Sequence, residues 1–164
     1  MNEKVIWHES LCFSGAGMTL IFIKASAQAT NDAELPNMLA MNSAPTVVNV
    51  SNSAQYVTFT AVLTDNLSGV QHASFYLTSP SGQTTLTPSV YNLISSSVLS
   101  GTFQGVLEMP QYSKAGDWLI HNVYMYDRLN NAGHLDEAQL RAMSIPITLT
   151  VITQYAVFLS IVLR

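Results

Sequence analysis

The stretch Tyr56-Val57-Thr58-Phe59-Thr60-Ala61-Val62-Leu63-Thr64 decides the fold of this chain. Apolar residues alternate along it mostly with threonine and tyrosine, and one face carries Val57, Phe59, Ala61 and Leu63. Alternation with a period of two is typical of a β-strand that buries one face and exposes the other. The stretch is therefore predicted to be a strand that lines the core of a β-sheet protein.

The same period recurs in four further segments, at residues 70–78, 103–109, 118–126 and 145–152. Turn residues such as Ser79-Pro80-Ser81-Gly82 separate the segments. About seven short strands with turns at such intervals predict an all-β fold, an antiparallel β-sandwich. Residues 136–143 alone have a helical composition, which predicts one short helix before the last strand.

The segment at residues 118–126 is the longest strand candidate. Trp118 is expected to fill the core. Further along the segment, alternation predicts one shared face for Leu119, His121, Val123 and Met125.

The composition is polar but almost uncharged. The 164 residues suffice for one domain, and 48% of them are hydrophobic. Charged residues make up 10%, against roughly 25% in a typical soluble domain. Six Lys and Arg residues and a net charge of −4 cannot form a patch that follows a phosphate backbone. A nucleic-acid partner is therefore excluded.

The first residues differ from the rest of the chain. A short apolar run at residues 15–23 precedes Ala27 and Ala29, which form the A-x-A pattern of a signal-peptide cleavage site. Residues 1–29 are predicted to be a signal peptide, with an N-terminal extension of the domain as the alternative. Cys12 is the only cysteine and lies in this leader, so the mature chain would have no disulfide. These features favour a secreted or cell-surface protein of a bacterial envelope.

The remaining boundaries follow from composition. Residues 30–44 have no clear period and are interpreted as a linker, residues 45–153 as the β-sandwich domain, and residues 154–164 as an apolar tail. Pro146 and the alternation that continues to Thr153 leave an apolar run too short to cross a bilayer as a helix. A membrane span is therefore not expected.

Four motifs in order carry a resemblance to a known family. They are Asp65-Asn66-Leu67-Ser68-Gly69-Val70, Ser79-Pro80-Ser81-Gly82, Pro110-Gln111-Tyr112-Ser113-Lys114-Ala115-Gly116-Asp117-Trp118, and Asp127 with Asn131-Ala132-Gly133. Together they resemble a bacterial Ig-like module of exported multidomain proteins, over about residues 44–153. The resemblance implies an Ig-like β-sandwich and a non-catalytic unit that serves as a spacer or as an adhesive or binding unit beside neighbouring domains. The loop after Asp127 departs from the pattern, with extra residues and with His134 where the family places Asn.

Acidic residues are scarce, and two of them end strands. Asp65 and Asp127 end the second and sixth strands, which finish at the same end of an Ig-type sandwich. Ca²⁺ binds carboxylate, amide and carbonyl oxygens, so this end is a candidate calcium site. Its candidate ligands are Asp65, Asn66, Asp127, Asn130 and Asn131, and Ser68 and Asp136 lie near enough in sequence to join them. The alternative is turn chemistry alone, because Asp and Asn at strand ends cap their own backbone.

Exposed aromatic rings suggest a second kind of site. Tyr124 and Tyr126 share the face opposite Val123 and Met125, and two outward rings can stack on the faces of a sugar. Cross-strand aromatic pairs that stabilise the sheet are the alternative. Neither a G-x-S-x-G motif nor a glycine-rich phosphate loop is present, and His72 and His121 lack zinc-ligand spacing. The sequence therefore predicts a non-catalytic structural or adhesive unit with Ca²⁺ as its one candidate cofactor, and a carbohydrate-binding accessory module as the alternative.

Overall fold

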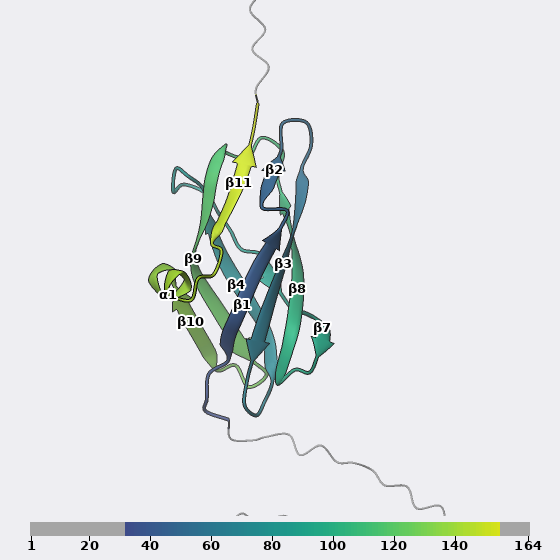
Figure 1. Cartoon of the computed structure of the whole chain (residues 1–164), viewed down its shortest axis with the longest axis vertical. Coiled ribbons are helices and arrows are strands. Elements are labelled where there is room, and N and C mark those ends of the chain that lie inside the picture. Colours follow the sequence, from purple (N-terminus) through teal and green to yellow (C-terminus); the bar gives the residue numbers. More distant parts are fainter. Residues whose placement is uncertain (1–31, 155–164) are drawn as a thin grey trace, which may run out of the picture.

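The computed structural model of the chain describes residues 32–154, which form two β-sheets packed face to face (Figure 1). Strands account for 58% of the structure and helix for 5%, so the predicted all-β sandwich is confirmed. The predicted signal peptide at residues 1–29 and the apolar residues from 155 onward lie outside the described residues.

The first sheet is antiparallel and has the strand order β1-β3-β8-β7. Its strands are β1 (Asn37–Ala44), β3 (Gln55–Thr64), β8 (Ser100–Met109) and β7 (Asn92–Ser96). The long central pair, β3 and β8, stays in register from Gln55 opposite Met109 to Thr64 opposite Ser100. The decisive stretch of the sequence thus lies in the middle of this sheet.

The second sheet has the order β2-β11-β9-β4-β5, with β10 paired to β9 and β6 paired to β4. Its strands are β2 (Val47–Asn49), β4 (Val70–Thr78), β5 (Thr85–Leu86), β6 (Ser89–Val90), β9 (Gly116–Asp127), β10 (Ala132–Asp136) and β11 (Thr148–Ile152). Helix α1 (Glu137–Ala142) precedes β11, as predicted. The β2–β11 pair is parallel and the other pairs are antiparallel. The two orders match the arrangement of strands in an immunoglobulin sandwich.

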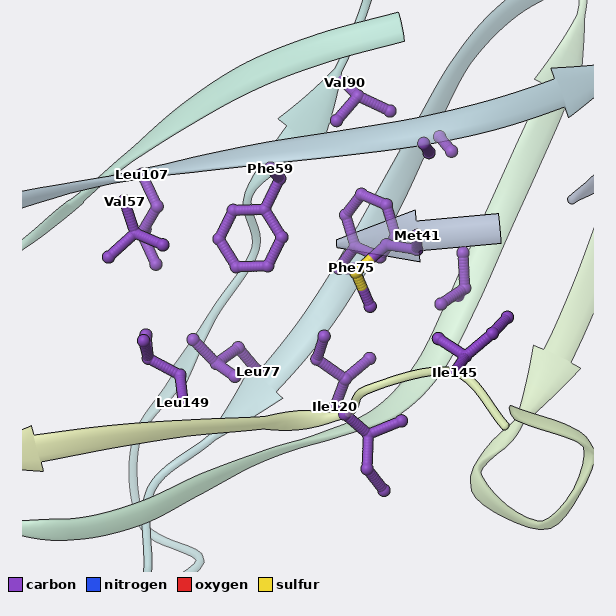
Figure 2. Close-up of a cluster of buried hydrophobic side chains, with 14 of the residues drawn as sticks. Met41, Val57, Phe59, Phe75, Leu77, Val90, Leu107, Ile120, Ile145 and Leu149 are labelled. Atoms are coloured by element: carbon purple, nitrogen blue, oxygen red, sulfur yellow. The ribbon is translucent and has the colours of Figure 1, made fainter. Parts of the chain in front are cut away.

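The core fills the space between the sheets. Figure 2 shows side chains from both sheets meeting there, including Phe59 of β3 and Phe75 of β4, whose ring centroids lie 5.5 Å apart. Trp118 is 2% exposed, and its indole N–H donates to the carbonyl of Lys114 at 2.8 Å. The expected inward face of β3 is confirmed, because its four alternating apolar residues are all buried.

Two segments differ from the sequence-based expectation because of β-bulges. Residues 37–44, interpreted as part of a linker, form β1, and a bulge between Met38 and Ala40 breaks the alternation that would have marked a strand. Met38 is fully buried while Leu39 is 55% exposed. One extra residue in a strand moves every later side chain to the other face, so the period is lost from the sequence pattern.

A second register shift changes the face of β9. The shift lies opposite Tyr76 and Leu77 of β4, so that Trp118 and Ile120 point inward together with Val123 and Met125. The expectation that Leu119 and His121 share the buried face was wrong. Both side chains are partly exposed, whereas the neighbouring Trp118 and Ile120 are buried.

The two ends of the described chain lie at opposite ends of the sandwich. The chain enters at the lower end beside the start of β1 and leaves at the upper end after β11 (Figure 1). Within residues 32–154, no helix is long and apolar enough to span a membrane.

Removing the Phe75 ring tests the core. Phe75 has no exposed surface, so Phe75→Ala is expected to lower the free energy of unfolding by about 3–5 kcal/mol. Urea unfolding followed by the fluorescence of buried Trp118 measures the change. Tyr91→Ala, at a side chain that is 72% exposed, is the control and should change stability by about 0.5 kcal/mol or less. Equal effects of the two substitutions would contradict this description of the core.

Candidate functional site

Asp65 closes the turn that follows β3. Its Oδ2 atom accepts hydrogen bonds from the backbone N–H of Leu67 at 3.2 Å and of Gly69 at 2.6 Å, and from the Ser68 hydroxyl at 3.4 Å. Gly69 has a φ of +88°, and a Cβ atom there would lie 2.8 Å from Cγ2 of Val98. Only glycine fits this turn without strain, so the Ser68-Gly69 pair of the sequence motif has a structural reason.

Asp127 closes the corresponding turn at the end of β9. Its Oδ1 atom accepts from the backbone N–H of Leu129 at 2.8 Å and of Asn131 at 2.7 Å, and its Oδ2 atom accepts from Nδ2 of Asn131 at 2.6 Å. Asn130 between them has a φ of 66°, a left-handed conformation that asparagine tolerates better than most residues. Asp127 is completely buried, and both of its oxygens accept hydrogen bonds from the loop that it organises.

Asp32 joins the two turns from the segment that enters the domain. Its Oδ2 atom accepts from the backbone N–H of Ser68 at 2.8 Å, and its Oδ1 atom accepts from the N–H of Glu34 at 3.1 Å. Its carbonyl oxygen accepts from Nδ2 of Asn131 at 2.9 Å. The hydrogen bond from the Ser68 backbone is the main reason that the pKa of Asp32 lies below its ordinary value.

The three aspartates form one cluster at the lower end of the sandwich. One carboxylate oxygen from each of Asp32, Asp65 and Asp127 can be chosen so that all three lie within 4.8 Å of one another. Oδ1 of Asp65 is buried and has no hydrogen-bond partner among the described residues. The site is therefore rich in oxygen atoms that can act as metal ligands.

The structure brings together only part of the set proposed from sequence. Asp65 and Asp127 meet, as the shared end of their strands predicts, but Asn66 and Asn130 are exposed turn residues. Asn131 reaches the cluster with its amide nitrogen, as a hydrogen-bond donor to Asp127 and Asp32. The sequence analysis missed Asp32, because it lies in the segment interpreted as a linker. Its position shortly before the first strand, in a chain with few acidic residues, was the available signal.

Asp136, the other acidic candidate, has a different role. It is the N-cap of α1: its side chain accepts from the backbone N–H of Gln139 at 2.8 Å, while the Gln139 side chain accepts from the N–H of Asp136 at 2.9 Å. This reciprocal capping box fixes the start of the helix, whose Leu140 is fully buried.

The outer face of the second sheet carries a cluster of rings. Tyr126 stacks on His72 at a centroid distance of 4.8 Å, and Tyr124 contacts His134 at 4.6 Å and the edge of Tyr76 at 5.5 Å. Tyr124 and Tyr126 thus point outward from the sheet, and each has one face against a neighbouring ring. His134 also lies 2.9 Å from Oδ1 of Asn122 through its Nε2 atom. Cross-strand contacts of this kind stabilise the sheet.

A second polar group ties α1 to β9. Glu137 accepts two hydrogen bonds from Arg141, at 2.8 and 2.7 Å, and lies 2.5 Å from Nδ1 of His121. The hydrogen bonds from Arg141, followed by the contact with His121, hold the pKa of Glu137 below its ordinary value of 4.5. His72 and His121 therefore have separate partners on the sheet surface, His72 a tyrosine ring and His121 a carboxylate.

Comparison with known proteins adds no relatives. No protein-family model, curated protein or solved structure matches this chain at a significant level. Functional inference therefore rests on the chain itself.

The Arg141–Glu137 contact predicts a specific pH dependence. A carboxyl group with a lowered pKa in the folded state stabilises the fold above its unfolded pKa, and this contribution is lost as the pH falls through the folded value. In a ¹³C NMR titration, Glu137 should have a midpoint below 4.5, and Arg141→Gln should raise it. The stability difference between the two chains should shrink as the pH falls through that midpoint.

The matched control for this titration is Lys114→Gln, which removes an exposed cation from the loop before β9 and should leave the Glu137 midpoint unchanged. An equal upward shift in both variants would mean that general charge, and not the hydrogen bonds from Arg141, sets the pKa.

Proposed function

We propose that the chain is a non-catalytic Ig-like module of an exported bacterial protein, in which it serves as a structural or adhesive unit that connects neighbouring domains end to end. One observation carries this proposal: the chain enters at one end of the sandwich and leaves at the other (Figure 1). Domains attached before and after it would be separated by the length of the sandwich. A connector needs this arrangement of its ends.

The strand pairs next to the two ends support a load-bearing role. Near the exit, β2 and β11 are parallel neighbours, with Val47 opposite Thr150 and Asn49 opposite Ile152. Tension on the two chain ends would pull β2 and β11 in opposite directions along their lengths. Their hydrogen bonds lie across the direction of pull and must break together, which resists force better than opening one bond after another.

The entering strand is held in the same way. β1 pairs with β3 from Asn37 opposite Thr64 to Ala44 opposite Thr58, and its start lies at the entry end. Pulling the entering chain would slide β1 along β3 rather than peel it away. Met38 and Met41, which are 0% and 5% exposed, would also have to leave the core. Both strands nearest the ends are thus loaded in shear.

The redox chemistry of the described domain is compatible with export. The only cysteine of the chain is Cys12, so residues 32–154 contain no thiol. Their fold therefore depends on no disulfide and is the same in an oxidising or a reducing compartment.

A carbohydrate-binding role is the weaker candidate. Sugar stacking needs open ring faces, whereas Tyr126 lies against His72 and Tyr124 against His134. The side chains of Tyr124 and Tyr126 are also partly buried in the outer surface of the sheet. These contacts favour the interpretation of the rings as cross-strand pairs.

Single-molecule pulling tests the connector. In a chain with Cys12→Ser, handles on cysteines introduced at positions 31 and 154 apply tension through the two ends. A second chain carries its handles at positions 53 and 154, which lie at the same end, because the N–H of Gln154 donates to the Ser51 hydroxyl at 2.8 Å. The end-to-end geometry is expected to need the higher unfolding force at the same loading rate, because it shears β1 and β2. Equal forces in both geometries would contradict the proposal.

A further inference from the structure

We propose that Asp32, Asp65 and Asp127 bind one Ca²⁺ ion, which fastens the entering chain to the two turns at the lower end of the sandwich. This inference is independent of the proposed function, because it depends only on the three carboxylates and their surroundings. Asp32 comes from the entering segment, Asp65 from the turn after β3 and Asp127 from the end of β9. A single ion would therefore join three segments that are distant in sequence.

The first argument is an unsatisfied oxygen. Asp65 is 7% exposed, and its Oδ2 atom accepts three hydrogen bonds from its own turn. Its Oδ1 atom is buried and accepts no hydrogen bond from a donor among the described residues, and the carboxyl group in contact with Asp65 is that of Asp32, which is also an acceptor when ionised. Buried polar atoms are nearly always satisfied, because removing one from water without a replacement is costly. A cation shared with the neighbouring carboxylates would supply the missing partner.

The second argument is that no basic side chain among residues 32–154 forms an ion pair with the cluster. Both ion pairs within residues 32–154 are made by Glu137, which is not part of the cluster. Arg128 directly follows Asp127, but its side chain is exposed, and only its backbone N–H bonds to the next turn, at the carbonyl of Gly69. Three acidic groups that lie together without a basic partner are favourable once a divalent cation neutralises them.

The third argument concerns which cation fits. All three donor atoms are carboxylate oxygens, which are typical ligands of hard cations such as Ca²⁺ and Mg²⁺. The oxygens lie within 4.8 Å of one another, close enough to be ligands of one ion. Ca²⁺ accepts six to eight oxygens in a flexible geometry, whereas Mg²⁺ requires a nearly ideal octahedron. Three carboxylates from separate segments therefore suit Ca²⁺ better, with water completing its ligands.

The consequence would be a metal-dependent attachment of the entering chain. Without the ion, the Ser68 N–H and the Asn131 side-chain amide are the described groups that hold Asp32 to the two turns. With it, the Asp32 carboxylate would share one bound ion with two buried aspartates. Calcium would then raise the stability of the folded chain by mass action, because only the folded chain assembles the site.

Calorimetric titration and thermal unfolding of the full chain test the proposal. The chain is stripped with EDTA and titrated with CaCl₂ or MgCl₂. We expect one Ca²⁺ per chain with a Kd below about 1 mM, weaker binding of Mg²⁺, and a melting temperature that is higher in CaCl₂ than in EDTA. Asp65→Asn and Asp32→Asn should each weaken Ca²⁺ binding by about tenfold or more, because each removes one charged ligand.

Asn keeps the shape of Asp but replaces one accepting oxygen with an amide nitrogen, so the calcium shift of each variant is measured from its own melting temperature in EDTA. Asp32 is only partly buried, and Asp32→Asn carries the test if Asp65→Asn does not fold. The matched control is Asp117→Asn, which changes an exposed carboxylate near the start of β9. This variant should bind Ca²⁺ as tightly as the original chain.

Three results would overturn the proposal. The first is no heat of Ca²⁺ binding together with no rise in melting temperature. The second is unchanged Ca²⁺ affinity in both Asp32→Asn and Asp65→Asn, which would place the ion elsewhere. The third is Mg²⁺ binding as tight as Ca²⁺ binding, which would contradict the assignment of the ion.

Discussion

Burial of the inward faces of two strand pairs, β3 with β8 and β4 with β9, is the constraint on which the rest of the structure depends. Alternate residues of these strands point into the core on each side of the bulges in β4 and β9, and Phe59 and Phe75 meet there from opposite sheets. A slip of one residue would turn the whole apolar set outward, so the core fixes the register of each pair. Fixed registers also fix where each strand ends, and therefore where the turns lie.

The lower end of the sandwich follows from that constraint. β3 and β9 both finish there, and each ends in an aspartate that satisfies the amides of its own turn. Asp127 is completely buried and Asp65 nearly so, although carboxylates are rarely buried without a partner. In a chain with only 10% charged residues, placing two of them here and bringing a third, Asp32, against them is a marked concentration of charge. A structural role in turns accounts for the hydrogen bonds, but leaves Oδ1 of Asp65 without a described partner.

Much of the fold could be predicted from the sequence, because unbroken alternation is a local property. β3 and β8 have that alternation throughout and β4 has it from Ala73 onward, whereas bulges in β1 and β9 shift the phase and hide the pattern. Whether a strand contains a bulge is decided by its partner, which the sequence of one strand does not reveal.

The same distinction applies to the candidate site. The meeting of Asp65 and Asp127 could be predicted because it follows from topology alone. The contribution of Asp32 could not, because it depends on the path by which the chain approaches β1. Nor could the sequence show that Asn131 presents its amide nitrogen to the carboxylates, since the conformation of its loop decides this.

The central claim is that a cation joins the entering chain to the two aspartate turns. The most direct measurement is the anomalous difference density of crystals of the full chain grown with CaCl₂, collected at a long wavelength where calcium scatters anomalously. The account predicts one peak between the carboxylates of Asp32, Asp65 and Asp127, at about 2.4 Å from an oxygen of each. The absence of a peak there, with Oδ1 of Asp65 bonded instead to water or to a shared proton, would contradict it.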